Sequence, residues 1–156
     1  MIEIREGRDE DAAGLIELIG TAYSEYPGCI LDVDREEPDL RAVATAYRRR
    51  DGRFWVAERA GRVVGSIGCA PSTEGMQLFK FYVARSERRQ GLGSKLETFV
   101  ETEARQRKFA MLHLWTDTRF TDAHAFYRGR GYRETGEVRD LHDLSNSLEY
   151  HFLKTL

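Results

Sequence analysis

Leu78-Phe-Lys-Phe-Tyr-Val-Ala-Arg-Ser-Glu-Arg-Arg-Gln-Gly-Leu-Gly93 is the stretch that decides the fold of this chain. Its first part, up to Val83, is mostly aromatic and apolar, which is typical of a buried strand. A polar loop follows, and after Gly93 the apolar residues recur at helical spacing, which predicts an amphipathic helix. A strand, a basic loop with glycines and a helix N-terminus together predict a diphosphate site. Glycines let backbone N–H groups approach phosphate oxygens, and the helix dipole favours their charge.

The residues of this loop narrow the kind of phosphate site. Arg88 and Arg89 would add charge-assisted contacts to a phosphate. No Gly-Lys-Ser/Thr follows the glycines, so the loop is not a Walker loop, and the three glycines of a Rossmann fingerprint are missing. The loop alone leaves one alternative open, which is an ordinary strand-to-helix turn with glycines at its corner.

Composition limits the class of protein. With 156 residues, 41% hydrophobic and 32% charged, the chain is expected to form one globular domain over residues 1–156. A net charge of −2 argues against a nucleic-acid partner. No apolar signal segment or transmembrane run is found, so no membrane association is expected. Cys29 and Cys69 match neither a metal-ligand spacing nor a disulfide framework, which predicts a reduced, cytoplasmic protein.

The remaining chain predicts alternating strands and helices. We expect strands at 1–5, 54–58, 62–70, 78–83, 110–116, 132–139 and 148–153, and helices after an N-cap at Asp9, from Pro38, at 91–108 and at 121–130. The strands at 54–58 and 62–70 form a hairpin that turns at Ala60-Gly61, and the next strand continues it antiparallel. The helix at 91–108 is a crossover, so the strands before and after it should run parallel.

Two motifs resemble those of the GNAT superfamily of N-acetyltransferases. Arg88-x-x-Gly91-x-Gly93, five residues after Val83, resembles the acetyl-CoA pyrophosphate loop of that family. The stretch from Ala123 to Tyr132 resembles its late helix, in which a tyrosine at the position of Tyr127 is commonly the general acid for the departing thiolate. The phenol is also chemically reasonable for this role. On the spacing of this helix alone, a packed aromatic is the better interpretation of Tyr127; together with the loop from Arg88 to Gly93, the general acid is favoured.

The resemblance implies a fold and an activity. The fold would be α/β, with a mixed and mostly antiparallel sheet of about six to seven strands, a splayed parallel pair at its centre and about four flanking helices. The activity would be transfer of an acetyl group from acetyl-CoA, as co-substrate, to a primary amine that attacks the thioester directly, with no metal. The implied catalytic residues are Tyr127 and the N–H of Phe81 as oxyanion donor. The implied CoA-binding residues are Phe81, Tyr82, Val83, Arg88, Arg89, Gln90, Gly91, Leu92, Gly93, Ser94, Ala123 and Phe126.

This chain departs from the family pattern at two positions that bear on catalysis. Many members carry a glutamate as general base where this chain has Gln77, and an asparagine where it has Phe120. An amide cannot take a proton, so the base is unassigned. An amine that arrives neutral would need none. The candidates in this chain are Glu25, Glu74, Asp117 and His142, acting directly or through water.

The sequence leaves alternatives for the roles of other polar residues and for the identity of the acceptor. His113 alternates with two leucines and is interpreted as a core histidine. Five carboxylates between Asp32 and Asp39 form a solvated loop or, since this segment usually walls the acceptor site in the family, attract a cationic amine. The favoured acceptor is a small-molecule amine. A protein lysine or N-terminus, or a CoA-binding sensor without turnover, are the alternatives, and a homodimer is left open.

Overall fold

The computed structural model describes residues 1–156 and contains one sheet of seven strands in the order β1-β2-β3-β4-β5-β7-β6. The strands are β1 (Ile2–Glu6), β2 (Arg53–Arg59), β3 (Arg62–Ser72), β4 (Gly75–Val83), β5 (Met111–Asp117), β6 (Arg133–Asp140) and β7 (Leu148–Thr155). The α-helices are α1 (Ala12–Ser24), α2 (Val33–Glu36), α3 (Val43–Arg49), α4 (Leu92–Gln106) and α5 (Thr121–Gly129). This confirms the predicted mixed, mostly antiparallel sheet, with a single-turn helix, α2, in addition to the four expected.

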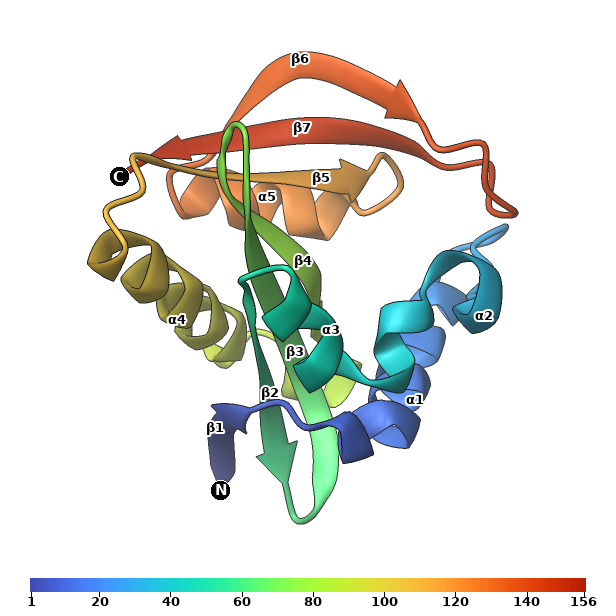
Figure 1. Ribbon diagram of the computed structural model, residues 1–156. Coiled ribbons are helices and arrows are strands. Elements are labelled where there is room, and N and C mark those ends of the chain that lie inside the picture. The colour runs from blue at the N-terminus through green and yellow to red at the C-terminus, as the bar shows by residue number, and fades with distance from the viewer.

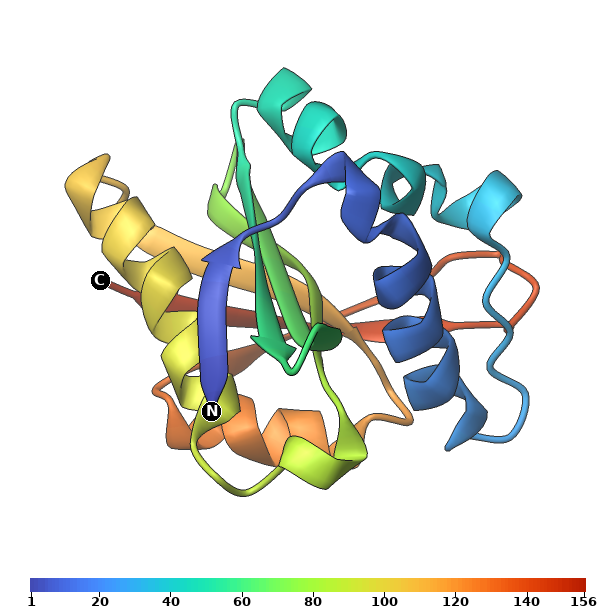
Figure 2. The ribbon, with the colours of Figure 1, turned by 90° about the horizontal axis from the view of Figure 1, so that it is seen from below.

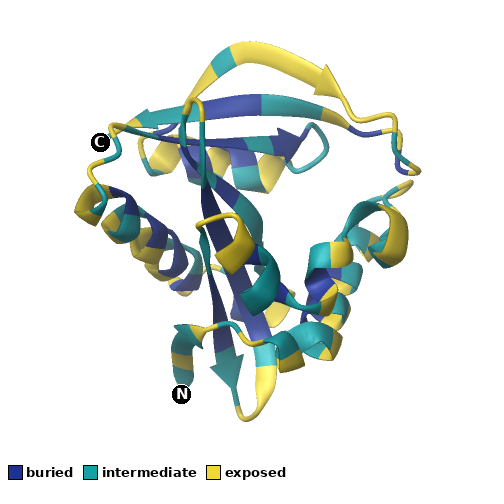
Figure 3. Ribbon diagram, in the orientation of Figure 1, coloured by how far each residue is buried: buried dark blue, intermediate teal, exposed yellow.

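Helices cover both faces of the sheet, so the apolar core has two parts. Side chains alternate across the strands: in β2, Phe54 and Val56 pack with α1 and α3, whereas Trp55 and Ala57 pack with α4. Figure 2 shows α1 and α3 on one side of the sheet and α4 and α5 on the other. Strand β6, at the edge of the sheet, is largely exposed (Figure 3). Most of its residues are charged, as is usual for a strand that must avoid pairing with another chain.

The two central strands part soon after they pair. Strands β4 and β5 run parallel, as predicted, but only Met76↔Leu112 and Gln77↔His113 are paired between them. Beyond these residues β4 bends away, and β5, β7 and β6 cross above it at a steep angle (Figure 1). The carboxyl-terminal halves of β4 and β5 therefore diverge, and the space between them is where parallel sheets commonly place a ligand.

A β-bulge interrupts β4 within the splayed half. Gly68 of β3 pairs with Phe79 and Ser66 pairs with Tyr82, so two residues of β4, Lys80 and Phe81, lie opposite one residue of β3. Lys80 has a φ of 51°, and the Ser66 hydroxyl donates a hydrogen bond of 2.6 Å to its carbonyl oxygen. A bulge re-aims the backbone locally, so it sets the direction of the groups at Phe81.

Two of the predicted helix starts are wrong in detail. Asp9 does not cap α1; its carboxylate accepts hydrogen bonds from the Thr45 N–H (3.0 Å) and hydroxyl (2.6 Å), and so it caps α3. The helix predicted from Pro38 is a 3₁₀ turn over Pro38–Arg41, and α3 begins only after a non-helical Ala42. None of the helices combines the length and the apolar character needed to cross a lipid bilayer.

A buried carboxylate joins the two helices on one face. Glu97 of α4 is fully buried and accepts a hydrogen bond of 2.8 Å from the hydroxyl of Tyr132, a residue that follows α5 in the chain. Arg130 also donates to Glu97, and the Lys154 ammonium of β7 lies 3.5 Å away. These three donors fix α4 against the end of α5 and against β7.

We expect Glu97→Gln to destabilise the protein by about 1.5–3 kcal/mol, the value of a hydrogen bond to a charged group. The amide keeps the shape but leaves two cations without their shared buried counter-charge. Urea unfolding of both forms measures the difference. The exposed pair at Glu17 and Arg62, 3.6 Å apart, offers the control: Glu17→Gln should change the unfolding free energy by less than about 0.5 kcal/mol. Equal effects of the two substitutions would contradict a role for the buried network.

Candidate active site

A cavity of about 960 Å³ fills the space where β4 and β5 part. Its walls come from the splayed halves of both strands, the loop before α4, one side of α5, the end of α1 and the loop between β6 and β7. Eleven of the residues that the sequence singles out line it: Phe81, Tyr82, Val83, Arg88, Arg89, Gly91, Gly93, Ser94, Ala123, Phe126 and Tyr127. Gln90 and Leu92 of the same loop do not; Gln90 is exposed and the Leu92 side chain is buried in the core.

The loop before α4 presents a run of unpaired backbone donors. None of the N–H groups from Arg89 to Ser94 donates a hydrogen bond to another protein backbone atom, because Lys95 makes the first bond of the helix, to Gly91. Gly91 has a φ of 84°, in the region that favours glycine, and a Cβ there would meet nothing within 4 Å. A Cβ on Gly93 would lie 3.4 Å from the Phe126 ring. The loop is therefore open at Gly91, and Gly93 faces the aromatic rings of the cavity wall, beside the positive end of a 15-residue helix.

The two loop arginines differ in what they contact. Both nitrogens at the end of the Arg88 guanidinium donate to the Glu25 carboxylate at 2.8 Å, and its Nε donates to the Val83 carbonyl at 2.9 Å. Arg88 thus fastens the loop to the end of α1 and to β4. The hydrogen bond from Arg88 lowers the pKa of Glu25. Arg89 is exposed, lines the cavity and makes no ion pair.

Tyr127 has an unpaired hydroxyl at the cavity. The residue is only 6% exposed, and its ring packs against Phe81, Phe126, Tyr132 and Phe152. Its hydroxyl makes no hydrogen bond within the protein. Since no polar side-chain atom is both fully buried and unbonded, the oxygen must reach the cavity surface. Burial raises the pKa of Tyr127, so the phenol stays protonated at neutral pH.

Strand β4 and helix α5 meet through aromatic contacts. The rings of Phe81 and Phe126 are 5.5 Å apart in a T-shaped arrangement, and Ala123 lies one turn before Phe126 on α5. The Tyr82 hydroxyl lies 3.5 Å from that of Tyr23 on α1. Burial raises the pKa of both phenols. At the two departures from the family pattern, Gln77 lines the cavity, and Phe120 packs against Tyr26 with ring centroids 4.8 Å apart.

The structure separates the four candidate bases. Glu25 is held by Arg88, and Asp117 by Arg119 at 2.8 Å, and the pKa of each carboxyl group is lowered. The His142 side chain is 83% exposed, at the cavity rim. Glu74 lies outside the cavity, in the turn between β3 and β4.

Three cavity carboxylates escaped the sequence analysis: Asp122, Asp143 and Glu149. Glu149 of β7 lines the cavity and accepts a hydrogen bond of 2.7 Å from Arg139 of β6. Burial nevertheless raises the pKa of its carboxyl group above the usual value. A cavity carboxylate whose pKa is raised is a stronger proton acceptor than an ordinary surface carboxylate. Nothing in the sequence around Glu149 distinguishes it from other acidic residues of the chain.

The acidic segment is partly neutralised. Lys80 pairs with Glu37 and lies 3.5 Å from Asp39, and Arg41 pairs with Asp34 at 3.1 Å. Asp32 caps α2 by accepting from the Arg35 N–H, and Glu36 accepts from the Leu144 N–H of the β6–β7 loop at 2.9 Å. Only Glu36 and Glu37 of this segment line the cavity. The segment therefore forms a wall tied to the β6–β7 loop, rather than a freely solvated run of charge.

Comparisons with known proteins give one family. The model of the acetyltransferase (GNAT) family matches residues 15–132. Similar proteins include N-acetyltransferase family 8 member 2 of Rattus norvegicus and N-acetyltransferase 8 of Homo sapiens. Each is 32% identical over 106 residues, which are 64% of this chain. These residues make up 47% of each relative, so the chain spans about half the length of the curated relatives it matches.

Solved structures share the fold over the whole chain. An acetyltransferase of the GNAT family from Staphylococcus aureus Mu50 superposes with a TM-score of 0.84 at 26% identity, covering 100% of this chain and 99% of that one. The PaiA N-acetyltransferase of Thermoplasma acidophilum, solved in complex with coenzyme A, gives a TM-score of 0.74 at 18% identity, with coverage of 100% and 99%.

Proposed function

Because the chain belongs to the acetyltransferase (GNAT) family, we propose that it is an enzyme that transfers the acetyl group of acetyl-CoA to a primary amine. The observation that carries this proposal is the run of unbonded N–H groups from Arg89 to Ser94, at the mouth of a cavity that also holds the free hydroxyl of Tyr127. The first group suits a diphosphate and the second suits a leaving thiolate. Their joint presence favours an enzyme over a sensor that only binds CoA.

The CoA would lie along the splayed half of β4. The diphosphate would accept hydrogen bonds from the N–H groups of the loop, including those of Gln90 and Leu92, whose side chains point elsewhere. Arg89 would add a direct contact, because it has no partner in the protein. Arg88 would act through Glu25, by holding the loop in place. The pantetheine chain would pass between β4 and α5, along Tyr82, Val83, Ala123 and Phe126.

The reaction is a direct attack. The neutral amine nitrogen bonds to the acetyl carbon, and the N–H of Phe81, aimed by the bulge, stabilises the negative charge that forms on the carbonyl oxygen. The carbon–sulfur bond then breaks, and the Tyr127 hydroxyl protonates the sulfur.

Glu149 is proposed as the base that takes the amine proton. Since burial raises its pKa, the carboxylate is present only above that raised value, and kcat/KM should increase with pH as it ionises. We expect Glu149→Gln to lower kcat/KM about 10²-fold and to remove this acidic limb. The dependence of kcat/KM on pH, measured for both forms with the same amine acceptor, tests this expectation. If the limb persists in the variant, the base is another group or the amine itself.

The acceptor is proposed to be a small molecule. The far part of the cavity is walled by α1, α2 and the β6–β7 loop, and Glu36 and Glu37 are the acidic groups of the α2 segment that face it. This enclosure favours a small cationic or polar amine over a protein lysine or N-terminus. A panel of amines and short peptides with acetyl-CoA, followed by release of free thiol, decides between them. Turnover of peptides alone would assign a protein acceptor, and no turnover of any amine would favour the sensor.

The location, partners and oligomeric state of this protein are also predicted from its sequence. A cytoplasmic location is supported by Cys29 and Cys69, which are both unpaired thiols. The net charge of −2 still argues against a nucleic-acid partner. Sedimentation of the purified protein would show whether it forms a homodimer.

A further inference from the structure

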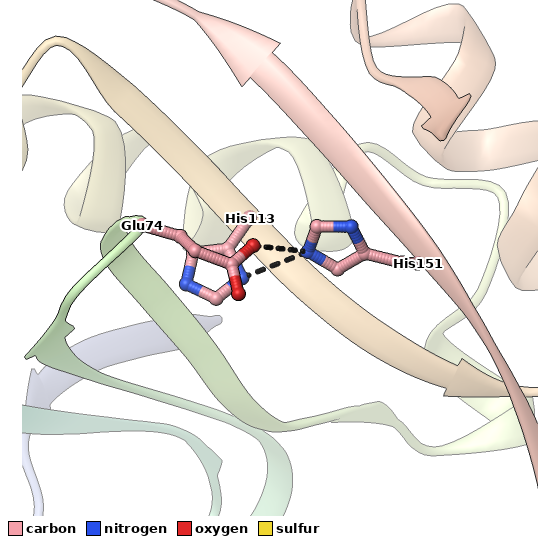
Figure 4. A group of neighbouring side chains, drawn as sticks. All are labelled: Glu74, His113 and His151. Atoms are coloured by element: carbon pink, nitrogen blue, oxygen red, sulfur yellow. Dashed lines mark hydrogen bonds and ion pairs between the residues drawn. The ribbon is translucent and has the colours of Figure 1, made fainter. Parts of the chain in front are cut away.

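We propose that Glu74, His113 and His151 form a binding site for one divalent transition-metal ion, Zn²⁺ by its chemistry, outside the acetyl-transfer cavity. One ligand atom of each residue lies within 4.8 Å of the others (Figure 4). The residues come from the β3–β4 turn, from β5 and from β7, and none of them lines the cavity. Imidazole nitrogen with one carboxylate oxygen is a ligand set that zinc uses in proteins.

Two of the three separations between the ligand atoms match those around a bound ion, and the third, from His113 to Glu74, is within 4.8 Å. The distance from His113 Nδ1 to His151 Nε2 is 3.1 Å, and from His151 Nε2 to a Glu74 carboxylate oxygen it is 3.3 Å. Zinc binds imidazole nitrogen at about 2.0–2.1 Å, so two ligands of a tetrahedral ion are about 3.3 Å apart. The site would therefore need little movement of the backbone to accept the ion.

In each imidazole ring, the nitrogen that would not bind the ion has a hydrogen-bond partner. These bonds orient the other nitrogen of each ring toward the proposed ion. The Ser72 hydroxyl donates to the Gly75 carbonyl at 2.9 Å, so it accepts the bond of 2.6 Å from His113 Nε2–H and leaves a lone pair on Nδ1. His151 Nδ1 lies 3.1 Å from a Glu137 carboxylate oxygen and 3.0 Å from the Thr135 hydroxyl. Such outer partners are what histidine ligands of metal ions almost always have.

The surroundings combine rigidity with access. Both imidazole rings are buried, with His113 1% and His151 2% exposed, and the ring of Trp115 lies 4.5 Å from that of His151. The Glu74 and Glu137 side chains are 51% and 62% exposed, so an ion can enter between them. The sequence sets His113 aside as a core histidine and Glu74 aside as a candidate base, because the three ligands are far apart along the chain.

The place of the site suggests what the ion would do. Strands β4 and β5 share only two residue pairs, Met76↔Leu112 and Gln77↔His113. The ion, bound by His113, would add a link across this narrow joint. It would tie the β3–β4 turn to β5 and β7, and so fix the angle at which the sheet opens. With three protein ligands, water would fill the fourth position; the ion would stiffen this joint, and the acetyl-transfer chemistry does not pass through it.

The test is metal uptake by untagged, chelator-treated protein. Titration with Co²⁺ should give visible d–d absorption that saturates at one ion per chain, and Zn²⁺ should displace it. Glu74→Gln, on an exposed turn, and His151→Gln should each weaken Zn²⁺ binding by more than tenfold in calorimetry. Glu137→Gln removes a partner of His151 Nδ1 and should weaken Zn²⁺ binding by about 10–100-fold. His142→Gln, which removes an exposed histidine elsewhere, should bind like the wild type.

Two results would overturn the proposal. One is the absence of saturable uptake by the wild-type protein, which would make the two rings an ordinary hydrogen-bonded pair. The other is unchanged Zn²⁺ affinity in Glu74→Gln, with the fold verified by circular dichroism, because the ion would then bind elsewhere. The melting temperature supplies a second readout: at the same Zn²⁺ concentration it should rise less in Glu74→Gln than in the wild type.

Discussion

Tyr127→Phe is expected to lower kcat by about 10²–10⁴-fold, the range of a lost general acid, and to leave the affinity for acetyl-CoA nearly unchanged. The substitution removes one hydroxyl and keeps the ring, so its contacts with Phe81 and Phe152 should survive. The hydroxyl makes no hydrogen bond inside the protein, so its loss leaves no buried partner unsatisfied. Steady-state kinetics on the best amine of the panel give kcat, and calorimetric titration gives the affinity.

Thermal unfolding of both forms, with and without CoA, is the control for this substitution. A small loss of turnover, below tenfold, would mean that water supplies the proton and that the hydroxyl only orients the thioester. Turnover equal to that of the wild type would make Tyr127 a packed aromatic. If neither form acetylates any amine while both bind acetyl-CoA, the sensor is the better description of this protein.

Gly93→Asp is expected to weaken CoA binding by about 10³-fold. A carboxylate there would lie beside the diphosphate, and two like charges 4 Å apart repel by about 4 kcal/mol at an effective dielectric constant of 20. A factor of ten in affinity corresponds to about 1.4 kcal/mol. A side chain at Gly93 meets the Phe126 ring at an ordinary contact distance, so the fold should persist. Calorimetric titration with CoA measures the loss.

The matched control is Gly93→Asn, which has the same size and no charge. If the repulsion is electrostatic, the Asn variant should bind CoA at least tenfold more tightly than the Asp variant, and added salt should narrow the gap. Equal losses would mean that bulk, not charge, is what the site excludes. Unchanged affinity in a folded Asp variant would show that the diphosphate does not bind at the N-terminus of α4.

The sequence predicted the parts of the fold that depend on local pattern. The apolar run of β4, the glycines before α4 and the turn at Ala60-Gly61 carry strong local preferences, and each lies where it was expected. The crossover through α4 also required a parallel pair, which is observed. The helix predicted from Pro38 begins only at Val43, and Asp9, a residue far away in the sequence, accepts hydrogen bonds from its first turn.

The parts of the site that the sequence missed depend on tertiary contacts. Lys80 adopts a φ of 51°, a backbone conformation for which a lysine gives no signal. Arg88 was expected to contact a phosphate, and in the structure it pairs instead with Glu25, at the end of α1. Glu149 owes its raised pKa to burial, which no local pattern around it reveals. The sequence therefore pointed to the loop and to Tyr127 as candidate site residues, but not to the groups that hold or complement them.

A crystal structure of the protein with CoA would test the central claim most directly. The account predicts diphosphate oxygens within about 2.7–3.2 Å of N–H groups between Arg89 and Ser94, the distance of an ordinary hydrogen bond. It also predicts that the pantetheine lies between β4 and β5, with the sulfur in hydrogen-bonding reach of the Tyr127 hydroxyl. A diphosphate bound away from the N-terminus of α4, or a sulfur on the far side of the cavity from Tyr127, would contradict it.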